Sequence, residues 1–277
     1  MPGRRSFRCT GTLEREARAK GYTFVAGADE AGRGSLFGPV FAAAVVLSPE
    51  RPIRGLRDSK ELPAEARLEL AAIIRDVALA WAVASVDAFL IDEVNIYQAS
   101  CIAMKRAIAQ LDPQPDCLLL DAVRLDLPVA QVRVIHGDAR CKTIAAASIL
   151  AKVERDRCMC DWNEVYPQYG LRRHKGYTTA EHLLALERYG PTAHHRFSYE
   201  PVRAACPRAL RFDAAQFSWM PARRYLAGIE PSRLRARYGP RRIAWEQAFQ
   251  AAAAAELEMP GSAAGELEMP GVAVGEA

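Results

Sequence analysis

Short apolar runs alternate along the chain with longer segments whose apolar residues recur at helical spacing. Five runs have the length and composition of strands: residues 22–28, 40–47, 79–86, 117–120 and 132–135. Four segments have helical composition or spacing: residues 64–77, 92–110, 143–166 and 179–189. Residues 144–151, in the first half of segment 143–166, are all small or apolar, which predicts close packing on a sheet. The pattern therefore predicts a domain that contains both strands and helices.

Acidic residues stand at the ends of three predicted strands. Asp29 and Glu30 open a turn of residues 29–39, Asp121 ends the fourth strand, and Asp138 follows the fifth. A carboxylate that ends an apolar strand is expensive to desolvate, which implies a metal or hydrogen-bond partner for Asp121. Together the four form the oxygen-only ligand set that Mg²⁺ or Mn²⁺ prefers. Taken singly, each Asp is more often a helix cap or a turn residue, and this alternative stays open.

The segment Asp-Glu-Ala-Gly-Arg-Gly at residues 29–34 places two carboxylates before a glycine-flanked arginine. Its backbone can approach a phosphate or a sugar closely, so we expect an anionic ligand there. The segment does not fit a dinucleotide-binding fingerprint, because Phe37 occupies the position of the third glycine. It does not fit a P-loop either, since no Lys-Ser or Lys-Thr follows the glycines. A solvated turn is the remaining alternative.

Length and composition narrow the class of protein. With 277 residues, half of them hydrophobic and a quarter charged, the chain can bury one large core. No apolar run approaches the roughly 18 residues of a membrane span, and residues 1–20 contain no apolar signal segment. The seven cysteines are scattered and never spaced as Cys-x-x-Cys, which favours reduced thiols over zinc or disulfides. We therefore expect a cytoplasmic protein that does not contact a membrane.

Charge is distributed unevenly along the chain. The net charge is +4, and residues 256–277 contain five Glu and neither Lys nor Arg, so residues 1–255 carry +9. A moderately basic body suits a phosphate backbone, although many proteins are as basic. We divide the chain into a lead-in (1–20), a main domain (21–207), an Arg-rich extension expected to be helical (208–255), and an acidic tail of low complexity expected to be disordered (256–277).

An ordered series of short motifs resembles ribonuclease HII along most of residues 20–203. The motifs are Ala-Gly-Ala-Asp-Glu-Ala-Gly-Arg-Gly (26–34), Gly-Pro-Val (38–40), Asp-Ser-Lys (58–60), Asp-Ala (121–122), Gly-Asp (137–138), Ile-Ala-Ala-Ala-Ser-Ile-Leu-Ala-Lys (144–152), Arg-Asp (155–156) and His-Lys-Gly-Tyr (174–177). The resemblance implies an α/β fold, the ribonuclease H-like mixed sheet flanked by helices, with the main domain as catalytic domain. It also implies that the metal-binding carboxylates are Asp29, Glu30, Asp121 and Asp138, with Mg²⁺ or Mn²⁺ as cofactor.

The same resemblance implies the reaction. The enzyme would be an endoribonuclease that cleaves the RNA strand of RNA/DNA hybrids, or a single ribonucleotide in duplex DNA, and leaves 3′-hydroxyl and 5′-phosphate ends. Two cations would position and deprotonate water, so no protein nucleophile is needed. Cleavage at single ribonucleotides would serve the repair of DNA. We expect a monomer; a sliding clamp is considered as a partner, but no motif in the sequence supports it.

Family knowledge further implies which residues recognise the substrate. The Gly-Arg-Gly element and the tyrosine of Lys-Gly-Tyr recognise the ribonucleotide and the deoxynucleotide after it. These residues are here Gly32, Arg33, Gly34 and Tyr177. Arg33 also separates the chain from the ribonuclease HIII group, where lysine is usual. Lys60 and Lys175 belong to the matching motifs, and we expect them to contact substrate phosphates.

Four positions depart from the family's pattern: Ser35, Phe37, His136 and Thr178. None of them is a proposed metal ligand. His136 stands where lysine is frequent and titrates near neutrality, so phosphate affinity is expected to depend more on pH.

Other charged residues are weaker candidates. Lys152 and Arg155 could contact phosphates, but charged helix faces are usually solvated. We interpret Asp156 as an ion-pair partner of Arg155 or Lys152. We do not interpret His194 and His195 as a metal pair, because neighbouring residues rarely ligate one ion together.

Two rival functions are weighed against a ribonuclease. A strand transferase or junction-cleaving enzyme on the same fold is disfavoured by the Gly-Arg-Gly and Lys-Gly-Tyr elements. A nucleic-acid-binding module without catalysis should have lost at least one of the four carboxylates, and all four are present.

Overall fold

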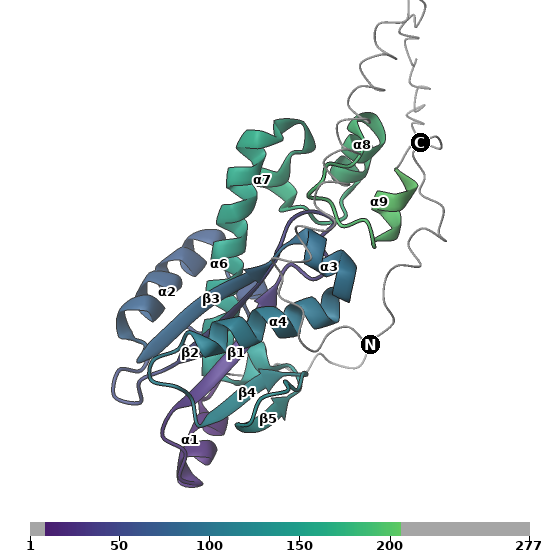
Figure 1. Ribbon diagram of the computed structural model, residues 1–277. Helices are drawn as coiled ribbons and strands as arrows, with labels where there is room; N and C mark the ends of the chain where they lie inside the picture. Colours follow the sequence, from purple (N-terminus) through teal and green to yellow (C-terminus); the bar gives the residue numbers. More distant parts are fainter. Residues whose placement is uncertain (1–8, 206–277) are drawn as a thin grey trace, which may run out of the picture.

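A mixed sheet of five strands forms the centre of the described part of the chain, residues 9–205 of a computed structural model (Figure 1). Its strands are β1 (Val25–Ala31), β2 (Val40–Val46), β3 (Ala80–Val86), β4 (Cys117–Asp121) and β5 (Ala130–Val134), in the order β3-β2-β1-β4-β5. Strand β2 pairs antiparallel with β1 and β3, whereas β4 pairs parallel with β1 and β5. The predicted mixed sheet is confirmed. The predicted extension (208–255) and tail (256–277) lie outside the described residues, and the domain boundaries stay predictions.

Helices cover both faces of this sheet (Figure 1). On one face, α3 (Ala88–Val94) and α4 (Ile96–Ala109) bury Ile91 and Met104. On the other face, α2 (Ala64–Val77) and α6 (Lys142–Val165) bury Ile74 and Ile149. Helix α1 (Thr12–Ala19) packs on the α6 face through Ala17. No helix among residues 9–205 is long and apolar enough to cross a membrane.

A separate apolar cluster surrounds the second half of α6, beyond one end of the sheet. It includes Phe37, Met159, Leu186 and Phe197. Helices α7 (Leu171–His174), α8 (Ala180–Tyr189) and α9 (Glu200–Ala204) lie around it (Figure 1). The remaining short helices are η1 (Ser59–Glu61), α5 (Gly137–Arg140) and η2 (Pro167–Tyr169). This end of the molecule brings the loops after β1 and after α7 into contact.

The first half of α6 lies unusually close to β1, as its small residues predict. A Cβ placed on Gly27 would lie 2.3 Å from the carbonyl carbon of Thr143, which no real side chain could occupy. Ala145, Ala146 and Ala147 are fully buried in the same interface. Small residues on both sides therefore set the distance between helix and sheet.

Two predicted elements differ in the structure. Asp29 and Glu30 do not open a turn but lie inside β1, because the strand continues pairing with β2 as far as Ala31. The predicted helix 92–110 is two helices, α3 and α4, separated by Asn95 with φ 69°. The Asn95 side chain accepts from the backbone N–H of Gln98 and so begins a new helix at this point.

Candidate active site

Two aspartates stand side by side on the parallel strands β1 and β4. The pairing of these strands runs to Ala28 and Leu120, and Asp29 and Asp121 are the next residue on each strand. Asp29 pairs across β2 with Ala43, which packs against α6, so its side chain points to the α6 face. Glu30, the next residue along, points to the opposite face. The end of β1 therefore presents carboxylates to both sides of the sheet.

Asp138 reaches the same place through α5. Asp121 pairs with Val134 at the end of β5, and the backbone N–H of Gly137 donates to Asp121 Oδ1 at 2.9 Å. A Cβ on Gly137 would lie 3.3 Å from the Cβ of Asp121, so the turn after β5 folds closely onto β4. Asp138 is the residue that follows, and it is buried.

Three of the four carboxylates, Asp29, Glu30 and Asp121, have pKa values above their usual range. Burial raises the pKa of Asp29 well above its usual range, repulsion from Glu30 and Asp121 adds to this, and a hydrogen bond from Ser148 opposes it. Burial raises the pKa of Glu30, against the attraction of Arg33. Burial also raises the pKa of Asp121, against the Gly137 hydrogen bond and together with repulsion from Asp138. Buried carboxylates that repel one another favour a cation among them.

The chemistry of this donor set fits a divalent cation, since all four groups are carboxylate oxygens. No three His, Cys, Asp or Glu side chains within residues 9–205 meet the geometry of a formed metal site, however. Basic groups already pair with two of the four: Arg33 Nη1 lies 3.2 Å from Glu30 Oε1, and Lys60 Nζ lies 3.2 Å from Asp138 Oδ2. The assignment of the four carboxylates as metal ligands stays a prediction.

Lys60 and Ser148 are two further groups at this site. Lys60 is brought there by η1, where Asp58 accepts from the Lys60 backbone N–H at 2.9 Å, and its side chain is 76% exposed. Ser148 on α6 lies 3.0 Å, oxygen to oxygen, from the buried hydroxyl of Ser59. The role of Ser148 beside Asp29 was missed by the sequence analysis. The sequence did contain a signal for it, because Ser148 is a hydroxyl-bearing residue among the otherwise apolar residues 144–151.

The Gly-Arg-Gly segment and the Lys-Gly-Tyr segment meet, although about 140 residues separate them. Ser35 and Tyr177 form an antiparallel bridge, and the backbone N–H of Leu36 donates to the Gly176 carbonyl at 2.8 Å. The buried Ser35 hydroxyl donates to the same carbonyl at 2.9 Å. Ser35, one of the four departures from the family's pattern, therefore contributes a hydrogen bond between the two segments.

The two glycines beside Arg33 lie in different surroundings. Gly32 has φ +97°, and a Cβ there would lie 2.0 Å from Arg155 Nε, so the fold itself requires glycine. A Cβ on Gly34 would meet nothing within 4 Å. The Arg33 side chain is 46% exposed, and the Arg33 carbonyl accepts from Arg196 Nη1 at 2.9 Å. Arg196 thus anchors the backbone of this turn through a hydrogen bond, whereas no atom of the described residues occupies the space beside Gly34.

Arg155 and Asp156 have structural contacts. Arg155 is fully buried, so both the phosphate contact and the solvated helix face considered for it are wrong. Asp156 pairs with Lys152 at 2.5 Å, which confirms the predicted ion pair. The Lys175 ammonium donates to the Arg172 carbonyl at 2.6 Å, and its contact with substrate stays a prediction.

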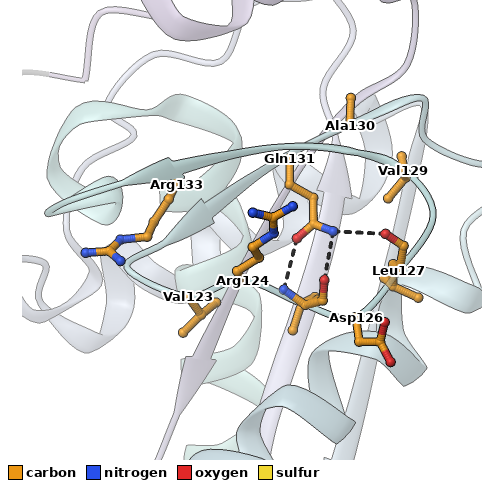
Figure 2. A pocket seen from close by; sticks show the side chains of 9 residues that line it. Val123, Arg124, Asp126, Leu127, Val129, Ala130, Gln131 and Arg133 are labelled. Carbon is orange, nitrogen blue, oxygen red and sulfur yellow. Dashed lines mark hydrogen bonds between the residues drawn. The ribbon is translucent and has the colours of Figure 1, made fainter.

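A hollow of about 760 Å³ lies in the connection from β4 to β5 (Figure 2). Its lining runs from Val123 to Arg133, and the Gln131 amide hydrogen-bonds the backbone of Leu125 and Leu127. None of the predicted site residues lines this hollow. The hollow is therefore distinct from the candidate site.

Comparisons with known proteins bear on the family of this chain. A family model described as Ribonuclease HII matches residues 26–202. The chain is 60% identical over 204 residues to ribonuclease HII of Solibacter usitatus strain Ellin6076, covering 74% of this chain and 90% of that protein. The crystal structure of ribonuclease H2 from Pyrococcus horikoshii OT3 is 25% identical with a TM-score of 0.58, covering 66% of this chain and 97% of that one. The RNase HII of Archaeoglobus fulgidus, solved as a complex with PCNA, is 27% identical with a TM-score of 0.56, covering 64% of this chain and 96% of that one.

These matches span most of the domain that carries the carboxylates and both loops, and they cover nearly the full length of the relatives. The chain therefore belongs to the ribonuclease HII family, whose members are metal-dependent ribonucleases of the H type that cleave the RNA of RNA/DNA hybrids.

Proposed function

We propose that this enzyme cleaves both the RNA strand of RNA/DNA hybrids and single ribonucleotides embedded in duplex DNA, and that it serves ribonucleotide removal in the cytoplasm. The observation that carries the proposal is the contact between the turn at Gly32 to Gly34 and the loop of Tyr177, directly after the strand that bears Asp29 and Glu30. A turn that reads one sugar and a ring that reads the next can then act together at a cluster of carboxylates.

Hydrolysis adds water to the phosphorus and breaks its bond to the 3′-oxygen, which leaves 3′-hydroxyl and 5′-phosphate ends. Asp29 and Asp121, side by side on β1 and β4, would hold Mg²⁺ or Mn²⁺ together with Glu30 and Asp138. Two bound cations would supply the activation of water and the neutralisation of charge on the leaving oxygen. The raised pKa values of Asp29, Glu30 and Asp121 support this role, since repelling carboxylates favour a shared cation.

Recognition of the 2′-hydroxyl is assigned to the backbone around Gly34. The open space beside this glycine supports the assignment, because protein packing does not require a glycine there and an approaching sugar does. Arg33, Lys60 and Lys175 would contact phosphates. Tyr177 would pack on the following deoxyribose, which lacks the hydroxyl that would collide with the ring. The monomeric state is part of the proposal, and a sliding clamp is supported as partner only by the Archaeoglobus relative, which was solved with PCNA.

The test uses a DNA duplex with one ribonucleotide, incubated with purified full-length protein and Mg²⁺. We expect one cut at the ribonucleotide, none in the all-DNA duplex, and none in excess chelator. Asp121→Asn should slow cleavage at least about a hundredfold while duplex binding persists, because a ligand is lost and the basic surface is not.

Asp126→Asn is the matched control, since Asp126 is an exposed carboxylate in the loop after β4. It should cleave at the wild-type rate. Near-native activity of Asp121→Asn, or cleavage that persists in chelator, would refute the carboxylate and metal assignment. Cleavage of a long hybrid without any cut at the single ribonucleotide would refute the second substrate.

A further inference from the structure

Three histidines lie directly behind the loop that carries Tyr177. His174 ends α7, His182 lies on α8, and His195 follows α8 in the chain. His182 and His195 are both fully buried, and neither the carboxylate site nor the Gly-Arg-Gly turn uses them. The sequence analysis gave no role to His194 and His195. In the structure His195 contacts His182 and Thr192.

The hydrogen bonds through His195 and His182 have a single consistent direction. The backbone N–H of Thr192 donates to His195 Nδ1 at 2.9 Å, so this nitrogen is the acceptor and the ring proton is on Nε2. His195 Nε2 lies 3.2 Å from His182 Nε2 and donates to it. The proton of His182 is therefore on Nδ1, which lies 3.1 Å from the carbonyl oxygen of Tyr177 and donates to it.

Both rings have the neutral form that this chain of bonds requires. Burial lowers the pKa of His182 to about 4, and the neighbouring His174 adds to the shift. Burial and repulsion from His182 and His194 hold the pKa of His195 well below its usual range. A doubly protonated His195 would turn an N–H toward the N–H of Thr192, which breaks the chain.

The same cluster holds the neighbouring residues of both recognition segments. His174 Nδ1 accepts from the Gly176 N–H at 3.1 Å, and the His174 ring stacks on His182 with centroids 4.6 Å apart. On the other side, Phe37 bridges to His195, and their rings are 4.8 Å apart, centroid to centroid. Phe37 lies three residues after Gly34, so the cluster contacts the chain just after the Gly-Arg-Gly segment as well as the Tyr177 loop.

We propose that His195 and His182 form a directed hydrogen-bond relay that positions Tyr177 for recognition of the deoxyribose after the ribonucleotide. Both are positioning residues, since neither reaches the surface where substrate binds. The relay fixes the tautomer of His182, and that tautomer fixes the donor at the Tyr177 carbonyl. The functional part of this inference rests on the proposed role of Tyr177 at the junction.

The relay itself is tested without substrate. Nitrogen NMR of the full-length protein at pH 7 should show the proton of His182 on Nδ1 and that of His195 on Nε2. A His182 that carries its proton on Nε2 would overturn the relay whatever the activities are.

A matched pair of variants tests the functional consequence. His182→Asn places an amide donor near the position of Nδ1, whereas His182→Gln places its amide near Nε2 and loses the donation to Tyr177. The readout is the ratio of cleavage at a single ribonucleotide to cleavage within a long RNA tract, with Tyr177→Ala giving the value for complete loss. His182→Asn should stay within about threefold of the wild-type ratio, and His182→Gln should fall about tenfold, toward Tyr177→Ala.

The outcomes separate the relay from the proposed function. Equal losses in both variants, with both activities and the melting temperature falling together, would mean that His182 is merely structural and would overturn the proposal. A wild-type enzyme without any preference for the junction would refute the role of Tyr177. The relay would then be judged by the tautomers and by the carbonyl carbon signal of Tyr177, which should shift in His182→Gln and not in His182→Asn. If the variants do not fold, the tautomers of the wild-type protein still decide.

Discussion

At the scale of single residues, Arg155 joins the two segments that we expect to read the sugars. Its Nη2 donates to the Ser35 hydroxyl at 2.7 Å and to the Lys175 carbonyl at 2.9 Å, and its guanidinium carbon lies 5.1 Å from the centroid of the Tyr177 ring. Its Nε and Nη1 have no hydrogen-bond partner among the described residues. A buried cation with incomplete hydrogen bonding lowers the stability of the fold. We therefore explain the presence of Arg155 by its positioning of the two segments and not by a contribution to stability.

Arg155→Met tests this explanation. Methionine keeps a long side chain beside Gly32 but removes the charge and both hydrogen bonds. We expect cleavage at a single ribonucleotide to fall at least about tenfold, while the melting temperature changes by only a few degrees, because replacing a buried charge by an apolar side chain is often neutral for stability. Arg157→Met, on the exposed side of the same helix, is the control. An unchanged cleavage rate in Arg155→Met would contradict the positioning role.

The buried histidines predict a dependence of stability on pH. His182 has a pKa of about 4 in the folded protein and titrates near 6.5 when unfolded, so the unfolded state binds more protons between these values. The free energy of unfolding should therefore fall as pH falls from about 6.5 to about 4, by about 1.4 kcal/mol per pH unit for His182.

Asp29, Glu30 and Asp121 act in the opposite direction, since their pKa values are raised. The measurement is therefore a comparison of denaturation midpoints across this pH range between the wild type and His182→Asn. The variant should lose less stability on acidification. Parallel curves would show that His182 does not stay neutral in the folded protein.

At the scale of elements, α1 stabilises the start of α6. Glu14 Oε1 accepts from the backbone N–H of Thr143 at 2.8 Å, in the first turn of α6. Cys141 Sγ lies 3.3 Å from the same oxygen. A carboxylate at a helix N-terminus satisfies a free N–H and interacts favourably with the helix dipole. The side chain of Cys141, the N-cap residue, does not cap α6. Glu14 on α1, 129 residues before Thr143 in the sequence, supplies the cap instead.

Glu14→Ala should lower the free energy of unfolding by about 1–3 kcal/mol, because the N–H of Thr143 loses its partner in a buried place. Glu14→Gln keeps an acceptor and loses only the charge, so its loss should be smaller, about 0.5–1 kcal/mol. Glu16→Ala, an exposed position on the same helix, should change stability by less than about 0.5 kcal/mol. Chemical denaturation measures all three, and equal effects at positions 14 and 16 would rule out the cap.

At the scale of the whole molecule, charge along the chain bears on binding to nucleic acid. The net charge is +4, and residues 256–277 contribute five negative charges and no positive ones. Truncation after Ala255 should therefore preserve cleavage and tighten binding to a duplex at low salt, with the difference shrinking as salt rises. Titration of duplex binding at several salt concentrations checks this. A truncated protein that loses most of its cleavage activity would show that the tail has another role.

The sequence by itself determined the element types and pointed to the carboxylates of the candidate site. The predicted strands and most of the predicted helices lie within a few residues of those in the structure, because each has a local periodicity that belongs to its own segment. The carboxylates on β1, β4 and α5 were visible for the same reason, since each stands beside an apolar run. The order of the motifs was sufficient to identify the family, which the comparisons confirm.

Only the tertiary structure decided how these pieces meet. The extension of β1 through Asp29 and Glu30 depends on pairing with β2, and the buried Arg155 donates a hydrogen bond to Ser35, which is 120 residues away. The cap from Glu14 and the relay to Tyr177 likewise join segments that share no local pattern. A hydrogen bond or a burial is a property of two surfaces in contact, and the sequence of one segment does not contain the other. For that reason the carboxylates of the candidate site could be named from the sequence, and the contacts that hold the two proposed recognition loops together could not.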